Sequence, residues 1–143
     1  MSYILIKDGS MVYPFDLYML QGHYPNTSFP DDLSRINLAE LGVFPLITNP
    51  QPAHDPMVQS VVLGVPVQQN GQWVRDWVVE SKPVDVAARN IRNKRNDLLS
   101  ASDWTQLADA SVDKTSWAQY RQALRDLPSQ SGFPYSITWP VAP

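Results

Sequence analysis

Short apolar runs separated by turn residues dominate the first half of the chain. Residues 3–6 form one such run, Asp8-Gly9 follows, and residues 11–13 form a second run. Two short apolar runs around an Asp-Gly pair are typical of a β-hairpin. The pattern therefore predicts that the chain begins with two paired strands.

A second hairpin is predicted over about residues 58–80. Its first arm is rich in β-branched residues, and Asn70-Gly71 is a strong type I′ turn sequence. Its second arm alternates, so that three large apolar residues share one face: Trp73, Trp77 and Val79.

Proline-punctuated loops and short elements are expected between these hairpins. Residues 15–20 fit a short helix that starts near Pro14, or a strand. We expect a helix from Asp31 or Asp32 to Leu41, ended by Gly42. The following stretch, 43–47, is predicted to be a strand at a sheet edge because it contains Pro45. Residues 49–56, with three prolines, read as an exposed connector.

Beyond residue 81 the apolar spacing becomes helical. A first helix is predicted at about 84–101 and a second at about 113–127, with Asp113 as its N-cap and Pro128 as its end. One stripe of the second helix carries Trp117, Tyr120, Leu124 and Leu127. Arg121 and Arg125 are placed on an adjoining face. The two helices are expected to form an antiparallel hairpin.

The last segment, 128–143, combines prolines with Phe133, Tyr135 and Trp139. It is too rich in proline for a helix and too aromatic to be stable in water, so we expect it to lie extended across another surface. The predicted fold class is α+β, with a β-rich module at 1–80 and a helical hairpin plus tail at 81–143.

Composition narrows the classes of function. The chain has 143 residues, 13 prolines, no cysteine, 17% charged residues and a formal net charge of −3. These values argue against a disulfide framework, a thiolate metal site and a strongly basic nucleic-acid binder. Residues 1–80 are acidic and residues 81–143 slightly basic, which favours two modules. No secretory leader and no membrane span are expected.

Candidate chemistry is sparse. His23 and His54 are read either as a base or metal ligand or, with more weight, as loop histidines. The Asp31-Asp32 pair is read as a carboxylate pair or, again with more weight, as a helix cap. A basic run near Trp104 suggests either nucleic-acid contact or, more strongly, a solvated helix face; it comprises Arg89, Arg92, Lys94 and Arg95. We therefore expect no catalytic site, no cofactor and no bound metal.

The carboxy-terminal half carries a resemblance to a known family. The motifs are RNKRNDLL at 92–99, SDWTQ at 102–106, WAQYRQALRDLP at 117–128, GFP at 132–134 and WP at 139–140. In order and spacing they resemble the tail assembly chaperone-like domain of bacteriophage tail-fibre proteins, over roughly 88–143. Ala108 departs from the pattern, which commonly has proline there. The amino-terminal half more loosely resembles the region that often precedes this domain.

This resemblance implies a non-enzymatic phage protein. It implies binding to a tail-fibre protein at its carboxy-terminal region, on a trimeric fibre, in the host cytoplasm, as an assembly chaperone or bound cap. A permanent structural component of the tail is an alternative, and a receptor-contacting tip a weaker one. Aromatic and basic side chains are the candidate partner contacts: Trp104, Trp117, Tyr120, Arg121, Phe133, Tyr135 and Trp139. The same aromatics can instead close the protein's own core; that interpretation is favoured for Trp117 and Tyr120 and is left open for Tyr135 and Trp139.

Overall fold

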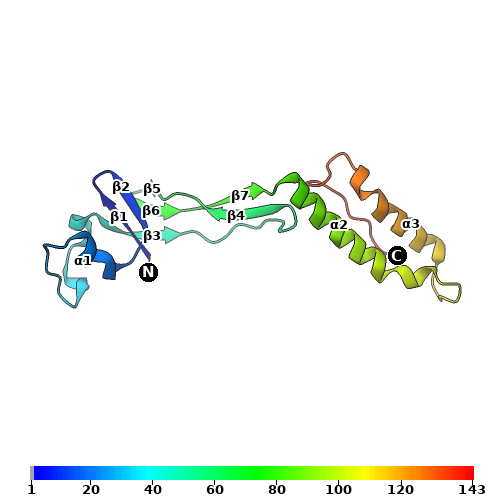
Figure 1. Ribbon diagram of the computed structural model, residues 1–143, viewed down its shortest axis with the longest axis horizontal. Helices are drawn as coiled ribbons and strands as arrows, with labels where there is room; N and C mark the ends of the chain where they lie inside the picture. Colours follow the sequence, from blue (N-terminus) through cyan, green and yellow to red (C-terminus); the bar gives the residue numbers. More distant parts are fainter. Residues whose placement is uncertain (1) are drawn as a thin grey trace. The chain divides into compact units, whose positions relative to one another are not determined.

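A computed structural model describes residues 2–143 (Figure 1). The chain forms two compact units. The amino-terminal unit comprises the described residues up to Pro52 together with Val62–Val78, and the carboxy-terminal unit comprises Ala53–Val61 and Val79–Pro143. Strands are the main regular elements of the first unit and helices those of the second, so the predicted α+β class is confirmed.

Five strands form the sheet of the amino-terminal unit, in the order β2-β1-β3-β6-β5. Their bounds are β1 Ser2–Lys7, β2 Ser10–Phe15, β3 Val43–Thr48, β5 Val67–Gln69 and β6 Gln72–Arg75. Strands β3 and β6 run parallel, and the other neighbours run antiparallel.

Both predicted turns are present. Asp8 and Gly9 have φ values of 51° and 76°, and Asn70 and Gly71 have φ values of 50° and 78°. Two successive residues with positive φ are what a type I′ turn requires, and Asp-Gly and Asn-Gly adopt them at low cost. The turns join β1 to β2 and β5 to β6.

The prediction that the strand with Pro45 lies at an edge is wrong, because β3 is the central strand. Ile6 N donates to Gly42 O at 2.8 Å, so the antiparallel register makes the Tyr3–Pro45 pair a non-hydrogen-bonded one. The pairing with β6 begins only at Leu46. Neither β1 nor β6 therefore requires a hydrogen bond from the N–H group that Pro45 lacks.

The predicted hairpin at 58–80 is split into two ladders. Its inner part is the β5–β6 hairpin, while β4 (Gln59–Leu63) and β7 (Trp77–Ser81) pair as a separate two-stranded sheet. The alternating stretch of the second arm is thus interrupted at Asp76, whose carbonyl oxygen accepts from Gly64 N at 2.8 Å. The division between the two units crosses both β4 and β7.

Only short helices occupy the long connection between β2 and β3. They are η1 (Leu17–Met19), α1 (Leu20–His23), η2 (Leu33–Arg35) and η3 (Leu38–Leu41), of which the three η elements are 3-10 helices. A helix start near Pro14 is wrong, since Pro14 belongs to β2.

The single helix predicted up to Leu41 is also wrong. Ile36 and Asn37 are extended, and the Asn37 side chain accepts from Ala39 N at 3.2 Å to begin a new turn. Two predicted features hold: Asp32 caps η2, and Gly42 ends η3 with a φ of 70°. A Cβ at Gly42 would lie 2.2 Å from the Ile6 carbonyl oxygen, so only glycine fits.

The core of this unit lies between the sheet and the β2–β3 connection. Its fully buried members are Leu5, Phe15, Leu20 and Val43. Half-buried residues of the connection, among them Tyr24, Phe29 and Leu41, pack around them.

Two helices dominate the carboxy-terminal unit. Helix α2 (Val84–Ala101) spans the predicted range, and α3 (Lys114–Asp126) is shorter by one residue at each end than the predicted 113–127. Asp113 is the N-cap, as predicted, accepting from Thr115 N and Ser116 N. The helices run antiparallel (Figure 1), joined by a connection that contains the 3-10 helix η4 (Asp103–Gln106).

The tail differs from the single extended segment predicted for 128–143. Its first part forms the 3-10 helix η5 (Leu127–Ser129) and a series of turns through Tyr135, with Ser136 N donating to Gly132 O at 2.7 Å. The remainder has no regular structure and doubles back along α2 and α3 (Figure 1).

The tail joins two small apolar clusters of the carboxy-terminal unit. One cluster is built on Val58, Ala87 and Ile91 and the other on Tyr120, Leu124 and Leu127. Ile137 and Trp139 pack against both clusters. Two helices alone bury little surface, so the tail completes the core that they lack.

Candidate partner-binding surface

A buried arginine joins the end of α2 to α3. Arg121 Nη1 donates to Leu99 O at 2.6 Å and to Ser102 Oγ at 2.8 Å, and Nη2 forms an ion pair with Asp103 Oδ1 at 2.6 Å. The last carbonyl groups of a helix have no partner within the helix and favour a nearby cation. Arg121 therefore caps α2 from the neighbouring helix, and we call this set of contacts the arginine latch.

Aromatic rings lead from the latch to the surface. Trp104, next to Asp103, lies 6.3 Å from Trp117 between ring centroids, and Trp117 lies 5.6 Å from Tyr120 with an edge-to-face geometry. Tyr120 is 8% exposed, whereas Trp104 is 50% exposed. Leu107, 57% exposed, follows on the same connection. We call Trp104, Leu107 and Trp117 the tryptophan surface.

The remaining candidate contacts belong to the tail. Phe133 and Trp139 are half-buried against the helices, with Arg92 over the Phe133 ring at 5.2 Å and Lys94 over the Trp139 ring at 4.9 Å. Tyr135 is exposed, and its hydroxyl donates to Lys82 O at 2.6 Å. Two cations of the basic run thus cover the tail aromatics of the same unit.

The structure separates the seven candidate residues into two groups. Tyr120 and Arg121 are buried, and Phe133 and Trp139 pack on their own unit. Trp104 and Tyr135 present exposed ring surface. Trp117 is half-buried, so its exposure is intermediate between those of the two groups.

The internal role of Arg121 was missed by the sequence reasoning. Arg121 lies four residues after Trp117 and three before Leu124, so helical periodicity places it beside the apolar stripe. Ser102-Asp103, at the end of the predicted first helix, supplies the matching acceptors. From these spacings the burial of Arg121 against the end of the first helix could have been predicted.

His23 and Asp32 each have a structural contact in the amino-terminal unit. His23 is half-buried with its ring 5.4 Å from that of Phe15. Asp32 accepts from the hydroxyl of Ser34 at 2.6 Å and from its N–H at 3.1 Å, and these hydrogen bonds lower the Asp32 pKa. The capping interpretation of Asp32 is therefore confirmed. Residues 2–143 contain no group of three histidine or acidic side chains placed to hold a metal ion.

Comparison with known protein families gives a match to part of the chain. Residues 88–143, less than half of the chain, match the family described as phage tail assembly chaperone protein. The matched segment contains most of α2, all of α3, the arginine latch, the tryptophan surface and the tail. The match supports a non-enzymatic role in phage tail assembly.

Searches among curated proteins and among solved structures found no match. No helix within residues 2–143 is both long and apolar enough to cross a membrane.

Proposed function

We propose that this chain is a tail-fibre assembly chaperone that binds the carboxy-terminal region of a phage fibre protein through its tryptophan surface. The observation that carries the proposal is the place of Trp104. It is half exposed within the segment that matches the chaperone family, and it directly follows a residue of the arginine latch.

A fibre protein needs such a partner before its trimer closes. Incomplete β-rich assemblies expose strand edges and apolar surface that pair wrongly with other chains. A chaperone covers such surface best with aromatic anchors whose position is already fixed, because little conformational entropy is then lost on binding. Trp104, which contacts Trp117 and adjoins Asp103, meets this requirement.

The other candidate residues take different roles in this proposal. Tyr135 offers a second exposed ring at the start of the tail. Tyr120, Arg121, Phe133 and Trp139 act indirectly, by holding the helices and tail in place. The protein acts in the host cytoplasm during assembly and needs no cofactor, nucleic acid or membrane.

Co-expression tests the proposal directly. The tail-fibre protein of the same phage is produced with and without this chain, and soluble trimer is measured by size-exclusion chromatography. We expect soluble trimer only when the chain is present. Equal yields of soluble trimer in both cultures would falsify the chaperone role.

Mass spectrometry of purified virions separates a transient chaperone from a permanent tail component. A transient chaperone is absent from the virion. A fixed, stoichiometric amount in the virion identifies a bound cap or structural protein instead.

A further inference from the structure

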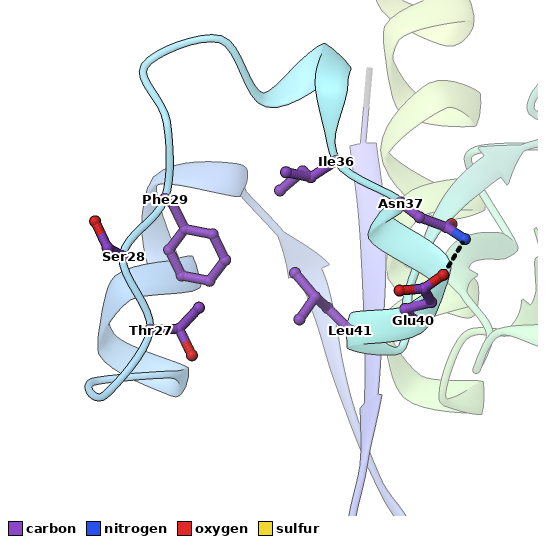
Figure 2. Close-up of a pocket in the computed structure, with 7 residues that line it drawn as sticks. All are labelled: Thr27, Ser28, Phe29, Ile36, Asn37, Glu40 and Leu41. Carbon is purple, nitrogen blue, oxygen red and sulfur yellow. Dashed lines mark hydrogen bonds between the residues drawn. The ribbon is translucent and has the colours of Figure 1, made fainter.

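A small pocket lies in the amino-terminal unit, outside the residues that match the chaperone family. Its volume is about 250 Å³, and Figure 2 shows the seven residues that line it: Thr27, Ser28, Phe29, Ile36, Asn37, Glu40 and Leu41. They come from the loop after α1 and from the η2–η3 region, whose helical turns are interrupted at Ile36 and Asn37.

The pocket has an apolar interior and a negatively charged group at one side, the carboxylate of Glu40. Phe29 and Leu41 face each other across it, with Ile36 above them in Figure 2, and all three are half-buried. At one side Asn37 Nδ2 donates to Glu40 Oε1 at 2.9 Å, while Asn37 Oδ1 accepts from Ala39 N. Glu40 Oε2 makes no hydrogen bond with any of the described residues 2–143.

The walls are held in place without a ligand. Tyr24 donates its hydroxyl proton to Leu41 O at 2.5 Å, and its ring meets that of Phe29 edge-on at 6.4 Å. On the loop side, Gln21 Nε2 donates to Thr27 O at 3.0 Å. A pocket formed in advance binds with a smaller loss of conformational entropy than one that must be assembled.

Size and charge define the occupant. At about 30 Å³ per water molecule the pocket has the volume of roughly eight waters, below the range of about 300–1,000 Å³ typical of drug-sized ligands. It therefore suits one long side chain. The apolar walls fit a methylene stem, and the carboxylate fits a cation at its tip.

Lysine fits better than arginine. An arginine fork is bound best by two carboxylate oxygens at once, but Oε1 of Glu40 is already paired with Asn37. One remaining oxygen suits the single ammonium of lysine. The surrounding unit favours a cation as well, since it holds six acidic and three basic residues.

We propose that this pocket binds a lysine side chain of a partner protein. It would provide a contact separate from the tryptophan surface, and the proposal stands whether or not the chain is a chaperone.

Nuclear magnetic resonance of the ¹⁵N-labelled full chain tests this, with Nα-acetyl-lysine amide as the probe. We expect concentration-dependent shifts of the Phe29, Ile36 and Leu41 amide signals. Nα-acetyl-norleucine amide keeps the stem but lacks the charge, and it should bind about two- to fivefold more weakly, as expected for the loss of an exposed ion pair.

Glu40→Gln should reduce binding of the lysine probe by the same two- to fivefold and leave the norleucine probe unaffected. Glu80→Gln, which removes an exposed carboxylate of the other unit, is the matched control and should bind both probes like the wild type. Absence of shifts at the pocket, equal affinity for the two probes, or tighter binding of Nα-acetyl-arginine amide would each overturn the proposal.

Discussion

At the scale of single residues, the buried charged side chain of Arg121 links α3 to the end of α2. It is 7% exposed and bonds to two acceptors at the end of α2 and to the carboxylate of Asp103. A buried cation is tolerated only when its donors are paired. The arginine latch meets that condition and also fixes the position of Asp103, the residue before Trp104.

Replacing Arg121 by methionine should lower the free energy of unfolding by about 2–3 kcal/mol, because Leu99 O and Ser102 Oγ then lose a charged donor. Chemical denaturation measures the change. Arg125→Met, on the exposed side of the same helix, is the control and should stay within about 0.5 kcal/mol of the wild type. Equal stability of the two variants would contradict the latch.

Asp113 gives the stability of α3 a pH dependence. The Ser116 hydroxyl, followed by the backbone N–H groups of Ser116 and Thr115, lowers the Asp113 pKa from its ordinary value of 3.8. The charged cap therefore stabilises the folded state above about pH 4, and this contribution is lost as pH falls through the lowered pKa.

Asn caps helices about as well as Asp but does not titrate in this range. Asp113→Asn should match the wild type at pH 7 and melt at a higher temperature than the wild type at about pH 2.5. Circular dichroism melts at the two pH values give the comparison. A wild type that loses no more stability than the variant on acidification would show that the cap is not charge-dependent.

At the scale of elements, the tail belongs to the fold of the carboxy-terminal unit. Phe133, Ile137 and Trp139 cover apolar residues of α2, and the last two also reach α3. The helix–tail contacts replace the partner helix or sheet that a two-helix hairpin requires.

Removal of residues 130–143 should therefore destabilise the helices themselves. Three half-buried apolar side chains at about 1–2 kcal/mol each predict a loss of about 3–6 kcal/mol. Removal of only 141–143, which are exposed, is the control and should change little. Thermal melts followed by circular dichroism at helical wavelengths measure the stability of both truncations. Equal stability of the two would mean that residues 130–140 do not stabilise the helices.

Local signals in the sequence were sufficient for two turns and for the two long helices. Asp-Gly and Asn-Gly located both turns, and apolar spacing with the Asp113 cap located both helices. The predictions failed where contacts between elements determine the local structure. Pro45 is tolerated in a central strand because of its register. Asn37 divides an expected helix into two turns. The burial of Arg121 depends on acceptors 18–22 residues away, which periodicity alone does not weigh.

At the scale of the whole molecule, charge is distributed unequally between the two units. The carboxy-terminal unit holds eight acidic and eight basic residues, while the amino-terminal unit is acidic. Each unit also exposes large apolar side chains, Trp104 in one and Tyr18 in the other. The proposed main binding site for the fibre protein is the tryptophan surface of the carboxy-terminal unit.

The most direct test of that claim is the soluble yield of the tail-fibre protein when it is co-expressed with three forms of this chain. Trp104→Ala removes a half-exposed ring, so the variant should fold but lose most of the soluble fibre trimer. Tyr18→Ala removes an aromatic ring that is 80% exposed in the other unit and should support the wild-type yield. Wild-type yield with a folded Trp104→Ala variant would contradict binding of the fibre protein through the tryptophan surface.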